Sequence, residues 1–128
     1  MATLQPRIQS AMASGGTRAA VDTFFDYVCP GLWSGLDEQG REPYLANDGE
    51  LLADLQMPQY GISADDLSRM TTPCVMVSGS ESNPVLRRVS LLIADSMPNG
   101  RFVEFPGVGH VTYAEAPSEF ASVVLSFA

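Results

Sequence analysis

Basic residues are scarce in this sequence of 128 residues, and histidine occurs only once. Seven Lys and Arg residues stand against 15 Asp and Glu residues, which gives a formal net charge of -8. A negative balance without a basic cluster disfavours contact with phosphate backbones, so we expect no nucleic-acid partner. With one histidine, no metal-ligand spacing among the acidic residues and no glycine-rich phosphate loop, the sequence predicts neither a metal site nor another cofactor.

Long apolar runs are also missing. No stretch approaches the roughly twenty apolar residues that cross a bilayer, and residues 1–10 lack the apolar segment of a signal peptide. We therefore expect no membrane partner and a reducing, cytoplasmic location. The two cysteines, Cys29 and Cys74, lie in apolar stretches, where a thiol behaves as a small hydrophobic residue.

Residues 1–70 carry helix signals and no convincing strand. The clearest signal is a set of apolar residues at the i, i+3, i+4 and i+7 spacing of one buried helical stripe: Val21, Phe24, Phe25 and Val28. Gly15-Gly16 predicts a break before this helix, and residues 47–50 and 63–66 carry the signatures of helix N-caps. Residues 30–43, rich in glycine and turn formers, are predicted to be a loop.

Residues 71–128 show a different pattern. An apolar run at residues 74–77 predicts a strand buried on both faces, and residues 101–105 predict a second short strand. Asn83-Pro84 predicts the start of a helix between them, with Val85, Val89, Leu92 and Ile93 as its apolar face, and Pro117 opens a last helix. The order strand-helix-strand-helix predicts two adjacent parallel strands. Two parallel strands do not form a stable sheet alone, so part of the sheet is expected from elsewhere.

Three segments carry a resemblance to a known family: Thr-Pro-Cys-Val-Met-Val-Ser-Gly at 72–79, Arg-Phe-Val-Glu-Phe-Pro-Gly-Val-Gly-His at 101–110, and Glu-Ala-Pro-Ser-Glu-Phe at 115–120. In order and spacing they resemble the C-terminal end of an α/β-hydrolase. The resemblance covers residues 62–128 closely and residues 1–61 loosely, as the variable helical lid of that family.

This resemblance implies a partial α/β-hydrolase fold of the α/β class. Residues 1–70 would form a helical lid or cap segment. Residues 71–128 would form the C-terminal part of the hydrolase core, with the strand-helix-strand-helix order and parallel strands described above.

His110 is the general base that the resemblance implies. It follows a glycine-rich loop past the end of a predicted parallel strand, where open α/β sheets place their ligands. An imidazole suits the task of taking a proton from a serine and returning it to a leaving group. The structural alternative is a histidine that caps a loop carbonyl. Because the chain has no other histidine, any Ser–His chemistry must use this one.

The acid that would orient this histidine departs from the family pattern. In the family an Asp often follows the glycine that ends the first of these strands, and here that position is Ser82. Glu81 is the adjacent carboxylate and a candidate for the role, since a Glu can fix an imidazole tautomer as an Asp does. The alternatives are that Glu81 is a solvated loop residue, or that the acid follows an earlier strand.

The nucleophile of such a hydrolase is absent. A nucleophile elbow needs Gly-x-Ser-x-Gly or a close variant, and the only glycines four apart, Gly31 and Gly35, have Trp33 midway. No oxyanion loop is recognised either. In the family both belong to the N-terminal half, so this chain alone is predicted to be inactive.

The sequence therefore predicts part of an α/β-fold hydrolase that acts on a small ester, amide or related substrate. Its expected partners are a small-molecule substrate and either a missing N-terminal hydrolase half or a second copy of the chain. Two alternatives are a non-catalytic binding or interaction protein derived from a hydrolase, and a self-associating α/β domain.

Two further groups of residues are interpreted as structural. Glu115 and Glu119 suit the dipole at the start of the last helix. Six apolar residues of the first half are predicted to form core in preference to an acyl pocket: Phe24, Phe25, Trp33, Tyr44, Met57 and Tyr60.

Overall fold

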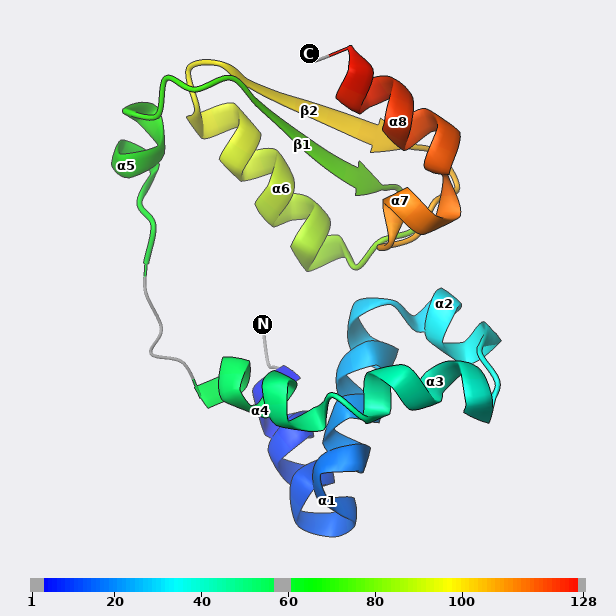
Figure 1. The fold of residues 1–128 in the computed structure, drawn as a ribbon. Helices are drawn as coiled ribbons and strands as arrows, with labels where there is room; N and C mark the ends of the chain where they lie inside the picture. Colours follow the sequence, from blue (N-terminus) through cyan, green and yellow to red (C-terminus); the bar gives the residue numbers. More distant parts are fainter. Residues whose placement is uncertain (1–3, 57–60, 127–128) are drawn as a thin grey trace. The chain divides into compact units, whose positions relative to one another are not determined.

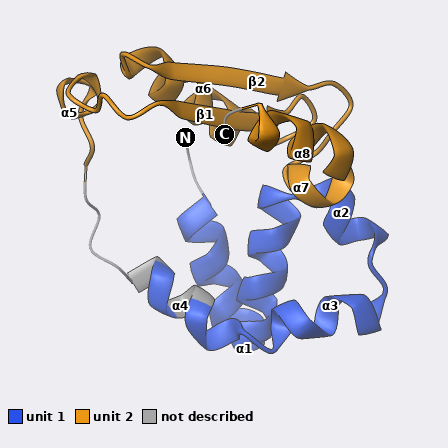
Figure 2. Cartoon of the chain, turned by 45° about the horizontal axis from the view of Figure 1, so that its top comes forward, with its two compact units in different colours: residues 1–59 blue, residues 60–128 orange. Residues whose placement is uncertain are grey.

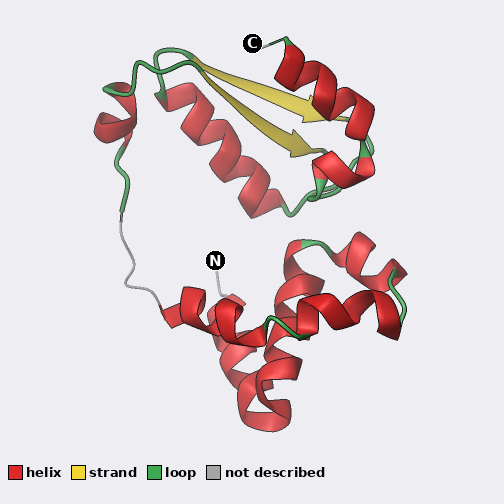
Figure 3. Ribbon diagram, in the orientation of Figure 1, coloured by secondary structure: helices red, strands yellow, loops and turns green. Residues whose placement is uncertain are grey.

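The computed structural model describes residues 4–56 and 61–126. The chain forms two compact units, Met1–Gln59 (unit 1) and Tyr60–Ala128 (unit 2), which Figure 2 shows in different colours. The described part of unit 1 is helical, and both described strands lie in unit 2 (Figure 3). None of the described helices combines the length and the apolar character that crossing a membrane needs.

The first element of unit 1, α1 (Leu4–Val28), consists of two helices joined at a kink. At the kink, Gly16 has φ 71° and ψ -163°. A positive φ of this size is strained for any residue that carries a Cβ, which explains why glycine ends the first helix here. The break predicted at Gly15-Gly16 is confirmed.

Residues 30–43, predicted to be a loop, are mainly helical, so that prediction was wrong. They contain α2 (Pro30–Gly35) and most of α3 (Glu38–Leu45), which is followed by α4 (Asp48–Gln56). Pro30 occupies the first turn of α2, where its missing N–H costs nothing. Asp37 caps α3 by accepting a hydrogen bond from the Gly40 amide at 2.8 Å.

Trp33 explains why these short helices form. Only 3% of it is exposed, and it packs with Val21 and Leu45 in the core of unit 1. Its ring stacks on Phe25 at 4.8 Å between centroids, and its indole N–H donates to Asp22 at 2.8 Å. Burial of this indole outweighs the turn-forming composition around it. The predicted core role holds for Trp33 and for Phe25, which packs against it, but not for Tyr44, which is 42% exposed. Met57 and Tyr60 lie outside the described residues.

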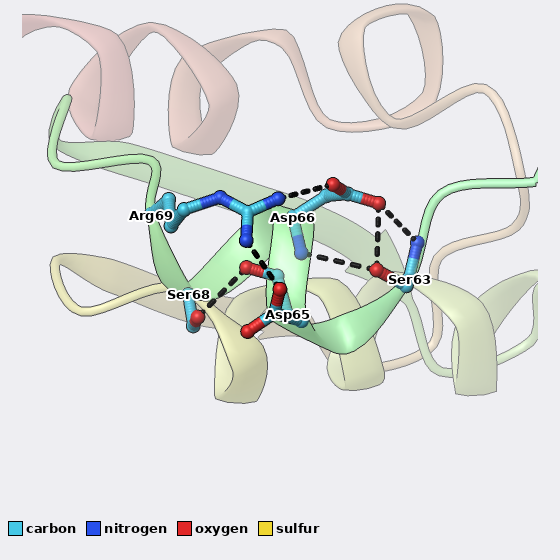
Figure 4. Close-up of polar contacts among 5 residues, drawn as sticks. All are labelled: Ser63, Asp65, Asp66, Ser68 and Arg69. Atoms are coloured by element: carbon cyan, nitrogen blue, oxygen red, sulfur yellow. Dashed lines mark hydrogen bonds and ion pairs between the residues drawn. The ribbon is translucent and has the colours of Figure 1, made fainter.

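Unit 2 opens with the short helix α5 (Ala64–Ser68). Ser63 and Asp66 form a reciprocal capping box, and Arg69 pairs with Asp65 and Asp66 (Figure 4). The hydrogen bond from the Ser63 hydroxyl is the main cause that lowers the pKa of Asp66. The capping box predicted at residues 63–66 is confirmed. Because α5 contacts α6, unit 2 begins before the core segment predicted at 71–128.

The rest of unit 2 alternates strands and helices in the predicted order. The elements are β1 (Cys74–Gly79), α6 (Pro84–Ser96), β2 (Gly100–Phe105), α7 (Thr112–Glu115) and α8 (Pro117–Leu125). The two strands are parallel and in register from Cys74 opposite Gly100 to Gly79 opposite Phe105 (Figure 1). Asn83 caps α6 as predicted, by accepting from the Val85 amide at 3.0 Å. The short helix α7 was not predicted.

Helix α6 contacts both strands, but not through the whole predicted face. Of the predicted apolar face, Val89 and Leu92 are 46% and 45% exposed, so this part of the face is not buried among the described residues. The helix instead buries Ala94, and Met97 just beyond its end. On β1, Val75 and Val77 line an open apolar hollow of about 390 Å³ together with residues of α8. Within the described residues β1 pairs only with β2, so its other edge has no neighbour strand.

Gly79 allows an unusually close approach at the end of β1. A Cβ at this position would lie 2.0 Å from the carbonyl oxygen of Val108 and 2.2 Å from that of Gly109. Both neighbours are backbone atoms, which cannot move aside without displacing the whole loop. Only glycine therefore lets the segment after β2 rest against the end of β1.

Gly79→Ala should destabilise unit 2 by about 2 kcal/mol or more, because the added methyl overlaps the backbone of Val108 and Gly109. The matched control is Gly61→Ala in the same unit, where the new methyl meets nothing within 4 Å. Urea unfolding followed by far-UV circular dichroism measures both variants. Equal midpoints for the two would contradict the packing described here.

Candidate active site

Two loops meet at the carboxyl edge of the parallel strands. The first loop (residues 80–83) follows β1, and the histidine loop (residues 106–111) follows β2. Both strands run in the same direction, so their ends lie side by side, as Figure 1 shows. Open α/β sheets bind ligands at this edge.

Successive residues of the first loop bond to the chain beyond β2. The Ser80 amide donates to the Phe105 carbonyl at 3.0 Å, and the Ser80 hydroxyl accepts from the Gly107 amide at 2.8 Å. One residue further, the Glu81 amide donates to the Val108 carbonyl at 2.9 Å. These bonds determine where the histidine loop lies before any side chain of its own contributes.

Ser82 and His110 are brought together by this arrangement. The Ser82 Oγ lies 3.1 Å from Nδ1 of the imidazole. Ser82 is buried, with 6% of its surface exposed, whereas His110 is exposed. An exposed imidazole is thus held through Nδ1 by a buried hydroxyl.

Glu81, the predicted acid candidate, has a different position. Its side chain is exposed, and its carboxylate accepts a hydrogen bond from the Ser80 hydroxyl at 3.4 Å. Among the described contacts it forms neither a hydrogen bond nor an ion pair with His110. The structure brings the imidazole to Ser82, at the position where the family pattern has an Asp, and not to Glu81.

A hydroxyl and a carboxylate act differently on an imidazole. A carboxylate only accepts, so it selects the tautomer with a proton on Nδ1 and leaves Nε2 free to act as a base. A serine hydroxyl both donates and accepts, so the Ser82 contact is compatible with either tautomer. It also carries no charge that would stabilise an imidazolium. The site can therefore position a base but selects its active form only weakly.

Glu115 is a site residue that sequence reasoning interpreted only as a partner of the helix dipole. Its carboxylate accepts from the backbone amides of Gly109 at 2.8 Å and Val111 at 3.1 Å. These are the residues on either side of His110. The sequence signal that could have identified Glu115 is its place, five residues after His110 and two before Pro117.

Two serines lie close to the histidine loop within unit 2. Ser82 is buried and contacts Nδ1 of His110, and the Ser80 hydroxyl accepts from the Gly107 amide. Ser34 belongs to α2, where its hydroxyl donates to the Gly31 carbonyl at 3.2 Å. Among the described residues there is also no group of three or more His, Cys, Asp or Glu side chains suited to a metal ion.

Comparison with families found no family model that matches the chain. Solved structures do resemble it. MenH from S. aureus has a TM-score of 0.65 at 16% identity, over 97% of this chain and 49% of that one. The proline iminopeptidase of Mycobacterium smegmatis has a TM-score of 0.60 at 20% identity, over 99% and 48%. The N-acyl homoserine lactone degrading enzyme Est816 has a TM-score of 0.59 at 20% identity, over 98% and 54%.

These three proteins have the α/β-hydrolase fold. The chain spans about half the length of each, since it covers 54%, 49% and 48% of them. Almost all of the chain takes part in each match, the helical unit included. The chain therefore has the fold of the C-terminal part of an α/β-hydrolase.

Proposed function

We propose that this chain supplies the general base, His110, of an α/β-fold hydrolase that acts on a small ester, amide or related substrate. The observation that carries the proposal is the contact between Nδ1 of His110 and Ser82. It holds the only imidazole of the chain at the carboxyl edge of two parallel strands, within a hydrolase fold. The similar solved structures support the hydrolase class.

The proposed mechanism uses Nε2 of His110. A serine outside this chain loses its hydroxyl proton to Nε2 as its oxygen attacks the carbonyl carbon of the substrate. The imidazolium then returns the proton to the departing alcohol or amine, which leaves an acyl-enzyme. Water attacks the acyl group in the same way, and the serine recovers its proton. The oxyanion of each tetrahedral intermediate needs hydrogen-bond donors, which we assign, like the serine, to the polypeptide that completes the hydrolase.

The partner that we propose is a polypeptide that supplies the N-terminal hydrolase half. The open edge of β1 and the hollow lined by Val75 and Val77 are where further sheet and helix would pack. On α8, Val124 and Leu125 are 52% and 75% exposed, which leaves apolar surface for the same contact. In each similar structure about half of the chain lies outside the match.

A second candidate function is a binding or interaction protein derived from a hydrolase. The observation in its favour is that a neutral hydroxyl, Ser82, holds the position at Nδ1 where a triad has a carboxylate. Activity measurements on the completed hydrolase, meaning this chain together with the polypeptide that carries the nucleophile elbow, distinguish the two functions.

His110→Ala should lower kcat of the completed hydrolase by roughly 10⁴-fold, because the nucleophile loses its base. Glu81→Gln should cost much less, since that exposed carboxylate does not bond to the imidazole. The chain without its partner should not hydrolyse p-nitrophenyl acetate above the buffer rate. Unchanged activity in His110→Ala would end the hydrolase interpretation, and equal severe losses for both variants would make Glu81 the acid.

Ser82→Asp should raise kcat of the completed hydrolase by roughly tenfold or more, because a carboxylate selects the Nδ1–H tautomer and stabilises the imidazolium. Ser82→Asn is the control of nearly equal size without the charge, and it should bring no gain. The imidazole ¹⁵N shifts of each variant report the tautomer directly. An equal gain in kcat in both variants, or no gain in either, would show that the missing charge at position 82 does not limit kcat.

The chain by itself should bind the dye ANS, because the proposed partner surface is exposed. Val124→Gln should reduce the fluorescence, whereas Ile62→Gln, which removes an exposed apolar side chain outside the hollow, should change it little. Equal effects would contradict an apolar partner surface at α8. Light scattering separates the alternatives: a dimer that hides the dye site indicates self-association instead of a hydrolase half.

A further inference from the structure

The carboxylate of Glu115 is bonded through both of its oxygens. Oε2 accepts from the Gly109 amide at 2.8 Å, and Oε1 accepts from the Val111 amide at 3.1 Å. The two amides flank His110 on either side. One side chain, at the end of α7, thus spans the backbone from which the imidazole projects.

Gly109 permits this arrangement. A Cβ at position 109 would lie 2.7 Å from Oε1 and 2.8 Å from Oε2 of Glu115. The carboxylate therefore occupies space that any larger residue before His110 would need. The Glu115 carboxylate can bond to the loop because Gly109 has no side chain in its way.

The chemistry of the contact requires a carboxylate. An ionised carboxylate offers acceptors on both oxygens, so it satisfies two backbone N–H groups together. A glutamine has one acceptor, and its amide group would turn a donor toward the second N–H. Glu119 provides the contrast: both glutamates are exposed, but Glu119 lies in the first turn of α8 and makes no described contact with the histidine loop.

We infer that Glu115 is a positioning residue that holds the histidine loop so that Nδ1 of His110 meets Ser82. This role rests on the proposed function of His110 as a base. It differs from the role predicted at the start of α8, because the carboxylate bonds to two specific amides: that of Gly109, and that of Val111, the N-cap residue of α7. The Glu115 carboxylate then adds to the supports already described for that loop: the close contact at Gly79, the Gly107–Ser80 bond and the Glu81–Val108 backbone bond.

Amide hydrogen exchange in the full 128-residue chain tests the contact. Glu115→Gln should speed exchange at Gly109 or Val111 by roughly tenfold, since a charge-assisted bond is lost at one of them. Glu119→Gln makes the same change of charge four residues further along the chain, at a side chain without a described contact to the loop. It should leave both exchange rates unchanged. Equal rates in the two variants overturn the inference.

Gly109→Ala keeps the proposal testable if Glu115→Gln does not fold. The added methyl displaces the flexible carboxylate while every charge remains, so exchange at Val111 should again accelerate. A folded Gly109→Ala chain with wild-type exchange at Val111 overturns the inference.

The ring signals of His110 distinguish positioning from a merely structural tie. They are unambiguous because the chain has one histidine. In Glu115→Gln the imidazole ¹⁵N shifts should move toward those of Ser82→Ala, in which the Nδ1 contact is removed. Ring signals that stay at wild-type values while the amides exchange faster overturn positioning. Failure of the proposed function shows separately, as unchanged activity of the completed hydrolase in His110→Ala.

Discussion

The close contact between the end of β1 and the loop that follows β2 is the constraint on which the site depends. Gly79 has no Cβ, so the carbonyls of Val108 and Gly109 lie against the end of β1. Two parallel strands in register bring their following loops to one edge, and this contact joins those loops. Backbone bonds from Ser80 and Glu81 follow from the same approach. The imidazole is then presented by a loop whose path is determined mainly by backbone.

The chemistry at that edge depends on the side chain that contacts Nδ1 of His110. Ser82 occupies the position at Nδ1 of His110 and contributes a hydroxyl in place of a charge. Because a hydroxyl accepts or donates, it orients the ring while leaving the tautomer open. A carboxylate at this position would both orient the ring and stabilise its charged form, whereas the Ser82 hydroxyl only orients it. Glu115 adds to the geometry only, because it bonds to backbone and not to the ring.

The two units differ in how their apolar surface is buried. Unit 1 encloses Trp33 almost completely, with Val21 and Leu45 around it. Unit 2 leaves Val124 and Leu125 exposed beside a hollow that reaches Val75 and Val77 on β1. A sheet of two parallel strands has too little neighbouring structure to cover both of its faces. The exposed surface of unit 2 is therefore consistent with the half-length match to solved hydrolases.

Several features follow from the sequence by itself because their causes are local. The strand patterns and the Asn83 cap predicted the strand-helix-strand-helix order, and the glycine pair predicted the kink at Gly16. The glycine-rich loop after the second strand made His110 the candidate base. Tertiary structure decided the rest. Helices form at residues 30–43 because Trp33 is buried by distant residues, against the local turn signals. Spacing along the chain did not show that Ser82, one residue beyond Glu81, reaches the imidazole, nor that Glu115 bonds to the loop before it. The Ser82–His110 contact depends on how close two loops approach, which is a property of packed backbone and not of any one segment. The Glu115 bonds are local, and they depend on how the chain turns from the histidine loop into α7.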